Sequence, residues 1–318
     1  MTALLVASTG GHLAQLARLR HRFTALEGRP VVWITFDTPQ SRALLNGQRV
    51  IYVPYTSQRD VKNVVANGFR ARQILRDLRP QIVISTGAAI ALSVLPLAAS
   101  HRAECHYVES AARGDGPSLT GRLLRRDPRI RLYTQHSSWA RGPWQYRGSV
   151  FDAWRPAPAV TSPTVSRAVV TLGTINYPFR RLLERLLAIL PPDVEVLWQT
   201  GATDVTGLAI EGRRTVPHTE LETAMAEADV VIGHSGIGSA ISTLERGRCP
   251  VLVPRERAHG EHVDNHQRQI ARELSARGLA ITRSVAELRW SDLVDAAALR
   301  AVSGTAPPFE LSRPGNPT

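Results

Sequence analysis

Cysteine, lysine and aromatic residues are scarce in this chain of 318 residues. The scarcity of cysteine and of aromatic residues argues against particular kinds of site. The two cysteines, Cys105 and Cys249, are far apart in the sequence, so they predict neither a disulfide framework nor a metal-binding motif. Aromatic residues make up 6% of the chain, too few to predict a platform on which nucleic-acid bases stack. We therefore expect a protein of a reducing compartment that does not bind nucleic acid.

Long hydrophobic runs are missing as well. The longest apolar stretch, residues 88–99, is far shorter than the ~20 residues that cross a bilayer, and Pro96 interrupts it. The first residues lack the basic segment and the apolar run of a signal peptide. These absences predict a cytoplasmic protein that contacts a membrane at most peripherally, at its inner face.

What the chain has in excess is arginine. Lysine and arginine total 39 against 27 acidic residues, and Lys62 is the only lysine, so the net charge is +12. Arginine suits phosphate and carboxylate ligands, although a GC-rich coding sequence produces the same excess. Residues 122–131 mix arginines with apolar residues, which predicts either contact with anionic lipid headgroups or an ordinary solvated surface.

Predicted strands and helices alternate along the chain, which indicates an α/β protein with parallel sheets covered on both faces. Strands are expected near residues 3–7, 31–36, 50–53, 81–85, 105–108, 131–134, 168–172, 194–199, 230–232 and 251–253. A proline-rich stretch separates two halves. We predict an N-terminal Rossmann-like domain (1–153), a linker (154–166), a C-terminal Rossmann-like domain (167–302) and a flexible tail (303–318).

The stretch 230–245 (VVIGHSGIGSAISTLE) reads as a strand, a turn of small residues and a helix. The free N–H groups at the start of such a helix, together with the helix dipole, attract anions. Glycines in the turn let a phosphate come close to the backbone. The pattern predicts a diphosphate site, and its plain alternative is a tight strand-to-helix connection without a ligand.

A second glycine turn follows the first predicted strand, at residues 8–12 (STGGH). It lacks the G-x-G-x-x-G spacing of dinucleotide-binding proteins, so a nicotinamide site is disfavoured although Asp37 ends the second strand. His12 stands where a general base would face a ligand, or it only caps the helix. Glu109 ends another strand and suits acid–base work or hydroxyl binding, with a plain surface glutamate as the alternative.

Residues 259–267 (HGEHVDNHQ) are rich in histidine, which suggests a metal site or a set of hydrogen-bonding groups for sugar hydroxyls. The sugar interpretation is favoured because no H-E-x-x-H motif is present. No D-x-D motif is present either, so we predict that no metal holds a diphosphate. Backbone N–H groups, hydroxyls and arginines would then meet its charge.

These segments together resemble glycosyltransferase family 28. The second half resembles the C-terminal domain of its MurG-like members in segments 171–174, 198–201, 228–239, 243–247, 253–255 and 260–267. The first half resembles the partner subunit of the two-subunit dolichol-linked UDP-GlcNAc transferases in segments 8–13, 84–87, 108–113 and 117–122. The chain is thus similar to the PssD and PssE proteins of bacterial polysaccharide synthesis joined into one.

The resemblance implies a GT-B fold, in which two Rossmann-like domains face a central cleft and bind a UDP-sugar (C-terminal domain) and an acceptor (N-terminal domain). On the donor side it implies contacts by Thr174, His218, His234, Ser235, Gly236, Ile237, Gly238, Ser239, Ser242, Glu245, His266 and Gln267. On the acceptor side it implies Gly10, Gly11, His12, Thr86, Gly87, Glu109 and Ser110.

One position departs from the family pattern. The family has a glutamate that binds the ribose seven residues after the position of Ser235, and this chain has Ser242 there. Glu245 stands three residues later, about 4.5 Å further along a helix axis. Either Glu245 reaches back, or Ser242 binds more weakly, or the nucleotide binds differently.

We therefore predict an inverting glycosyltransferase in which His12 or Glu109 deprotonates an acceptor hydroxyl. UDP would leave towards Thr174 and the helix start at residues 235–239. The acceptor would be a lipid-linked glycan or polysaccharide precursor, or a natural product. The alternatives are a UDP-sugar 2-epimerase and a non-catalytic GT-B scaffold subunit, with a nucleic-acid-binding protein a distant third.

Overall fold

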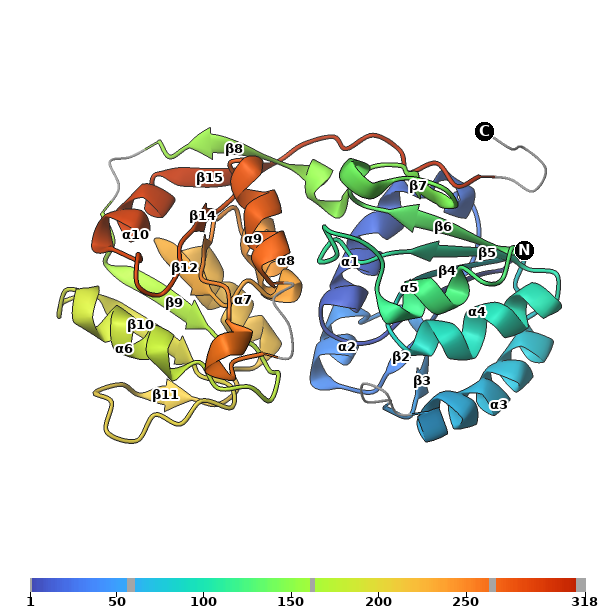
Figure 1. Ribbon diagram of the computed structural model, residues 1–318, viewed down its shortest axis with the longest axis horizontal. Helices are drawn as coiled ribbons and strands as arrows, with labels where there is room; N and C mark the ends of the chain where they lie inside the picture. Colours follow the sequence, from blue (N-terminus) through green and yellow to red (C-terminus); the bar gives the residue numbers. More distant parts are fainter. Residues whose placement is uncertain (1, 56–60, 161–163, 263–266, 313–318) are drawn as a thin grey trace. The chain divides into compact units, whose positions relative to one another are not determined.

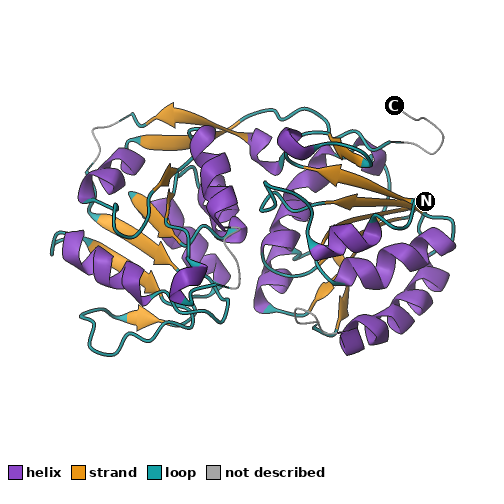
Figure 2. Cartoon of the chain, in the orientation of Figure 1, coloured by secondary structure: helices purple, strands orange, loops and turns teal. Residues whose placement is uncertain are grey.

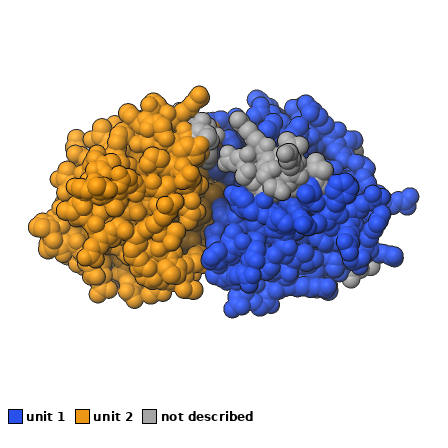
Figure 3. Space-filling model, turned by 90° about the horizontal axis from the view of Figure 1, so that it is seen from below, with its two compact units in different colours: residues 1–150, 306–318 blue, residues 151–305 orange. Residues whose placement is uncertain are grey.

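The computed structural model describes residues 2–55, 61–160, 164–262 and 267–312, and the side chains of residues 61–65 are outside the description (Figure 1). The chain divides into two compact units. The first consists of residues 1–150 and 306–318, and the second of residues 151–305 (Figure 3). Each unit has its own sheet and core.

The first unit is built on a parallel sheet. Within the described residues it has seven strands in the order β3-β2-β1-β4-β5-β6-β7. The strands are β1 (Ala3–Ala7), β2 (Val31–Phe36), β3 (Arg49–Val53), β4 (Ile82–Gly87), β5 (Glu104–Val108), β6 (Ile130–Thr134) and β7 (Trp144–Tyr146). The helices are α1 (Gly11–Leu19), α2 (Pro39–Leu44), α3 (Val61–Leu78), α4 (Ile90–Ser100) and α5 (Leu119–Leu124).

Helices cover both faces of this sheet, with α3, α4 and α5 together on one face (Figures 1 and 2). Every residue of β1 and of β4 is buried, which explains why these strands are apolar runs without alternation. The expected strands and their order along the chain are thus present.

The second unit repeats this plan. Its described residues form a six-stranded parallel sheet in the order β11-β10-β9-β12-β13-β14. The strands are β9 (Arg167–Thr171), β10 (Glu195–Gln199), β11 (Gly212–Arg213), β12 (Val230–Gly233), β13 (Val251–Leu252) and β14 (Ile281–Thr282). The helices are α6 (Arg180–Ile189), α7 (His218–Glu227), α8 (Ile237–Glu245), α9 (Gln267–Ala276) and α10 (Trp290–Ala297).

In each sheet the strand order reverses between two adjacent strands. The reversal lies between β1 and β4 in the first unit and between β9 and β12 in the second. The connections leaving such a pair go to opposite faces of the sheet, which opens a crevice at the carboxyl ends of the strands. The turns after β1 and β4 therefore meet in one unit, and those after β9 and β12 meet in the other.

The segment expected to be a linker is partly a strand. β8 (Trp154–Pro158) pairs antiparallel with β15 (Leu299–Ser303), and both belong to the second unit. Prolines lack the N–H that a central strand needs, but they are accepted in a strand that has a neighbour on one side. The proline count therefore suggested a linker where the structure has an edge strand.

The expected flexible tail is also different, because its described part packs on the first unit. Phe309 is completely buried, and its ring lies 5.3 Å from that of Phe23 and 5.7 Å from that of Tyr133. Arg22 donates a hydrogen bond of 2.9 Å to the Pro307 carbonyl, and the Ser312 N–H donates one of 2.9 Å to the Tyr133 hydroxyl. One aromatic side chain thus fixes a segment that composition alone marks as unstructured.

None of the helices in the described part of the chain combines the length and the apolar character that crossing a bilayer requires.

Replacing Phe309 by alanine removes this anchor. We expect Phe309→Ala to lower the free energy of unfolding by about 3–5 kcal/mol, because the cavity between two aromatic rings cannot close fully. The matched control is the exposed neighbour Glu310, whose replacement by alanine is expected to change stability by about 0.5 kcal/mol or less. Urea unfolding of both variants measures the difference, and equal stabilities would contradict the anchoring role.

Candidate functional site

The turn between β12 and α8 ends in an open helix start. Gly236 precedes the helix, and the first helical hydrogen bond runs from the Ala240 N–H to the Gly236 carbonyl at 3.0 Å. The N–H groups of Ile237, Gly238 and Ser239 therefore have no acceptor within the helix. Gly238 and Ser239 are partly exposed, so this end of α8 can offer its N–H groups and its positive dipole end to an anion.

His234 joins this turn to the turn after β9. Its Nδ1 lies 3.2 Å from the Thr171 carbonyl and therefore donates to it. A Cβ on Gly173 would lie 2.6 Å from Cε1 of the His234 ring, and a Cβ on Gly236 would collide with the same ring. Both positions must be glycine for the imidazole to fit between the two turns.

Ser235 is held in an unusual conformation. Its φ is 59°, in the left-handed region, and its side chain is completely buried. Its hydroxyl has no hydrogen-bond partner among the described residues. Strained residues and unpaired buried hydroxyls are uncommon, and they concentrate at ligand sites.

The residues of the β9–α6 connection and of α9 that are predicted to bind the sugar donor differ in exposure. Thr174 is exposed beside Gly173, on the turn that His234 contacts. Gln267 is buried, and its Oε1 accepts a hydrogen bond of 3.0 Å from the Arg255 N–H. His266 lies outside the described residues. The structure thus brings Thr174 and the start of α8 to the same strand pair and gives Gln267 a bond within the protein.

Ser242 and Glu245 lie on one side of α8. Ser242 is partly exposed and follows Gly238 and Ser239 on the same helix face at the i+4 and i+3 positions, while Glu245 is exposed one turn further on. His218 is the first residue of α7, and its Nε2 is 3.5 Å from Glu222. The geometry does not favour either Ser242 or Glu245 as the predicted ribose contact.

The first unit has a comparable turn after β1. His12, in the first turn of α1, donates from Nδ1 to the Thr86 carbonyl at 2.6 Å, and the Thr86 hydroxyl donates back to the His12 carbonyl at 2.8 Å. With the proton on Nδ1, the lone pair of the neutral ring is on Nε2. A Cβ on Gly87 would lie 3.3 Å from the His12 ring, so the absence of a side chain there keeps room for the ring.

Glu109, the second candidate base, is completely buried. Its carboxylate accepts hydrogen bonds from the Ser118 N–H (2.8 Å) and hydroxyl (2.9 Å), the Ser110 N–H (3.1 Å) and the Tyr107 hydroxyl (3.1 Å). Burial raises the pKa of this carboxyl, although the four hydrogen bonds oppose the shift. Glu109 therefore has the contacts of a group that holds the start of α5, whereas His12 is partly exposed.

A buried network lies beneath the N-terminus of α1. Gln15 donates to the Gly11 carbonyl at 2.9 Å and to the Ser110 hydroxyl at 3.0 Å, and Gln135 donates to Gln15 at 2.9 Å. The Gly10 N–H donates to Gln40 at 2.9 Å. Sequence reasoning missed Gln15 and Gln135, because a lone glutamine in a helix carries no motif.

Comparisons with known proteins show what the chain is similar to. Residues 169–291 match the glycosyltransferase family 28 C-terminal domain. A Chlorobium luteolum protein, the UDP-N-acetylglucosamine–N-acetylmuramyl-(pentapeptide) pyrophosphoryl-undecaprenol N-acetylglucosamine transferase, is 30% identical over 257 residues. That match covers 72% of this chain and 66% of the relative, so it spans just under two thirds of the relative's length. Residues 169–291 of the C-terminal unit thus match the C-terminal domain of glycosyltransferase family 28.

Solved structures share the architecture of this chain. MurG from Acinetobacter baumannii has a TM-score of 0.57 at 18% identity, over 93% of this chain and 89% of that one. S. aureus MnaA with UDP has a TM-score of 0.59 at 9% identity, over 97% and 92%. At such identities the likeness concerns the fold alone, and with the two parallel sheets it confirms the predicted GT-B fold.

The histidine-rich segment of the family 28 domain contributes few described contacts. His259 lies 3.7 Å from Glu256, and the His262 ring is 5.6 Å from that of Tyr177. Across the part of the chain that the structure describes, no three His, Cys, Asp or Glu side chains converge as metal ligands would. Sequence reasoning also assigned no individual role to Arg255, although it belongs to the segment 253–255 that resembles the family and lies three residues after the end of β13.

Gly173 provides a test of the packing around His234. Gly173→Ala is expected to lower the free energy of unfolding by clearly more than the roughly 1–2 kcal/mol that an alanine in the left-handed conformation costs, because its Cβ displaces the His234 ring. Gly207→Ala is the matched control, since Gly207 has a similar φ of 78° and a Cβ added there would meet nothing within 4 Å. Chemical unfolding measures the loss of unfolding free energy in each variant, and NMR measures the chemical shifts of the His234 ring. Equal losses in the two variants, together with unchanged His234 shifts, would refute the steric role.

Proposed function

We propose that this protein is a UDP-sugar-dependent glycosyltransferase that transfers a sugar to a hydroxyl acceptor. The observation that carries the proposal lies in the family 28 unit. There the turns after β9 and β12 meet where the strand order reverses, and His234 packs between Gly173 and Gly236. Beside them the start of α8 offers N–H groups to an anion.

In this proposal the diphosphate of the donor binds the N–H groups of residues 237–239, with Thr174 adding its hydroxyl. These groups become most useful when the bond to the sugar breaks, because the leaving UDP gains negative charge. The ribose lies along the exposed side of α8, where Ser242 and Glu245 are its candidate partners. Gln267 and His266 are the candidate contacts of the sugar.

We propose His12 as the general base. The Thr86 carbonyl holds the proton on Nδ1, so Nε2 is the nitrogen that accepts a proton from the acceptor hydroxyl. The hydroxyl oxygen then forms the new bond to the anomeric carbon while the bond to UDP breaks. A single displacement of this kind inverts the configuration. Glu109 acts indirectly in this scheme, by orienting the segment around Ser110 and Ser118.

The first experiment measures donor binding and transfer separately. Calorimetry with UDP and UDP-sugars tests the donor site, and labelled sugar tests transfer. His12→Ala is expected to reduce transfer by about 10²–10⁴-fold, the usual contribution of a general base, with nearly unchanged UDP affinity. His12 belongs to the other unit from the proposed donor site.

The outcomes separate the alternatives. No binding of any UDP-sugar by the wild-type protein would overturn the proposed function. Binding without transfer to any acceptor would identify a non-catalytic subunit, and a changed sugar in the absence of acceptor would identify an epimerase. A large loss of UDP affinity in His12→Ala would reassign His12 to donor binding.

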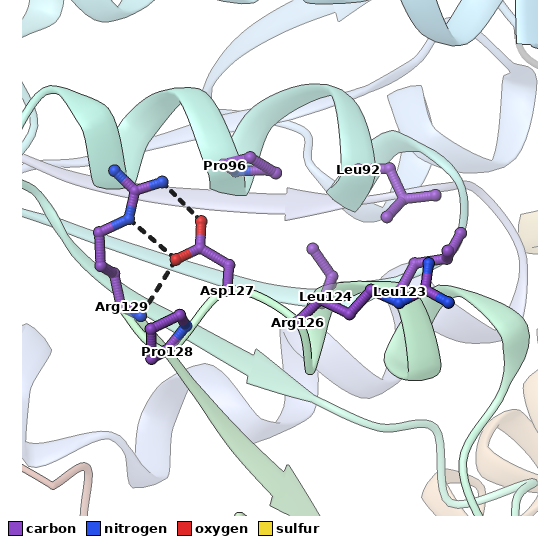
Figure 4. Close-up of a pocket in the computed structure, with 8 residues that line it drawn as sticks. All are labelled: Leu92, Pro96, Leu123, Leu124, Arg126, Asp127, Pro128 and Arg129. Carbon is purple, nitrogen blue, oxygen red and sulfur yellow. Dashed lines mark hydrogen bonds and ion pairs between the residues drawn. The ribbon is translucent and has the colours of Figure 1, made fainter.

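We further propose that the acceptor is lipid-linked and that the first unit meets the membrane around α5. A hollow of about 430 Å³ lies between α4 and α5 and the turn that follows (Figure 4). Leu92 and Pro96 of α4 and Leu123 and Leu124 of α5 give it an apolar wall. Arg122, Arg125 and Arg126 are exposed and Arg126 also lines the hollow, whereas Arg129 is paired with Asp127 at 2.7 Å.

This patch predicts binding to anionic lipid. The wild-type protein is expected to co-sediment with vesicles that contain phosphatidylglycerol and to release them at high salt. Replacing Arg122, Arg125 and Arg126 together by glutamine is expected to remove about 1 kcal/mol of binding per residue. Neutral phosphatidylcholine vesicles are the control. Equal binding of the triple variant to anionic vesicles would exclude this patch as the contact.

A further inference from the structure

Arg255 is an enclosed charge in the family 28 unit. It follows β13, its side chain is 0% exposed, and its guanidinium carbon lies 5.6 Å from the centre of the Phe179 ring. Burial lowers the pKa of Arg255 to about 10, while the Glu261 carboxylate opposes this shift. The group is therefore still positively charged at neutral pH.

The Arg255 guanidinium holds the β9–α6 connection. Its Nη2 donates hydrogen bonds of 3.0 Å to the Leu172 carbonyl and of 3.0 Å to the Tyr177 carbonyl. These carbonyls stand before and after residues 173–176, which carry Gly173 and Thr174. A single nitrogen thus fixes both ends of the turn that His234 contacts from the β12 side.

The main chain of Arg255 holds a second element. Its N–H donates to Oε1 of Gln267 at 3.0 Å, and Gln267 is the first residue of α9. One residue therefore connects the turn at Thr174 with the start of α9. Any shift of Arg255 would move both.

The charge of Arg255 is incompletely matched by the protein. Nε and Nη1 have no hydrogen-bond partner among the residues that the structure describes. The nearby Glu261 carboxylate is bonded elsewhere, to Arg181 at 2.8 and 3.0 Å and to the Glu256 N–H at 2.9 Å. Enclosing a charge without a bonded counter-charge is destabilising, so stability alone does not account for an arginine here.

We infer that Arg255 is a positioning residue of the donor site. It fixes the turn that carries Thr174 and the side chain of Gln267 in one arrangement, and it places a positive charge behind the turn where a diphosphate binds. This inference rests on the proposed function and adds a residue that holds the site without touching the substrate.

Arg255→Met tests the inference because methionine fills a similar space without charge or donors. We expect the affinity for UDP to fall about tenfold or more, which corresponds to about 1.4 kcal/mol. The affinity for uridine, which has no phosphates, is expected to change less than about threefold, since the nucleoside does not use the turn. Calorimetry gives the dissociation constant for UDP, and an NMR titration gives the one for uridine.

Arg181→Met is the matched control, because it removes a neighbouring arginine whose hydrogen bonds among the described residues go to Glu261 and not to the turn. It is expected to leave the ratio of UDP to uridine affinity unchanged. Arg255→Lys keeps the charge but loses the fork of donors, so an intermediate ratio is expected. If Arg255→Met does not fold, Arg255→Lys alone decides. A ratio of UDP to uridine affinity in Arg255→Lys equal to that of the wild-type protein then overturns the inference.

Equal losses of UDP and uridine affinity in Arg255→Met would reveal a purely structural role and overturn the inference. An unchanged UDP affinity would do the same. Both results leave the proposed function intact, whereas absence of UDP binding by the wild-type protein overturns the proposed function itself.

Discussion

The reversal of strand order within each sheet is the constraint on which both candidate sites depend. β1 and β4 in one unit, and β9 and β12 in the other, are neighbours whose following connections go to opposite faces. Their carboxyl ends therefore stay uncovered, and the loops that follow them line a crevice. Every residue proposed to touch a diphosphate or an acceptor follows from the placement of these four strand ends.

Around β9 and β12 two side chains hold the backbone. His234 occupies the space that glycine leaves at positions 173 and 236, and Arg255 donates hydrogen bonds to the carbonyls of Leu172 and Tyr177. Such support fixes the hydrogen-bond donors of the proposed anion site before a ligand binds, which reduces the reorganisation that binding requires. The strain at Ser235 lies within the same turn.

The two candidate bases of the first unit occupy similar places in the sequence but differ in burial. His12 and Glu109 both follow strand ends and both are polar. Glu109 is enclosed, and its four hydrogen bonds orient the segment that leads to α5, while His12 remains partly exposed with one nitrogen committed to Thr86. A sequence cannot distinguish these cases, because burial depends on how the chain folds around the carboxylate, here with Tyr107 and Ser118 donating hydrogen bonds to it.

The sequence by itself determined the alternation of strands and helices, the two halves and the glycine turns at 173 and 236, because these follow from local periodicity and from the backbone freedom of glycine. Only the tertiary structure decided that Phe309 anchors the C-terminal segment, that Pro156 lies in a strand and that Arg255 bonds the turn at Thr174. Each of these depends on contacts between residues far apart in the chain, and such contacts leave no pattern in the neighbouring sequence.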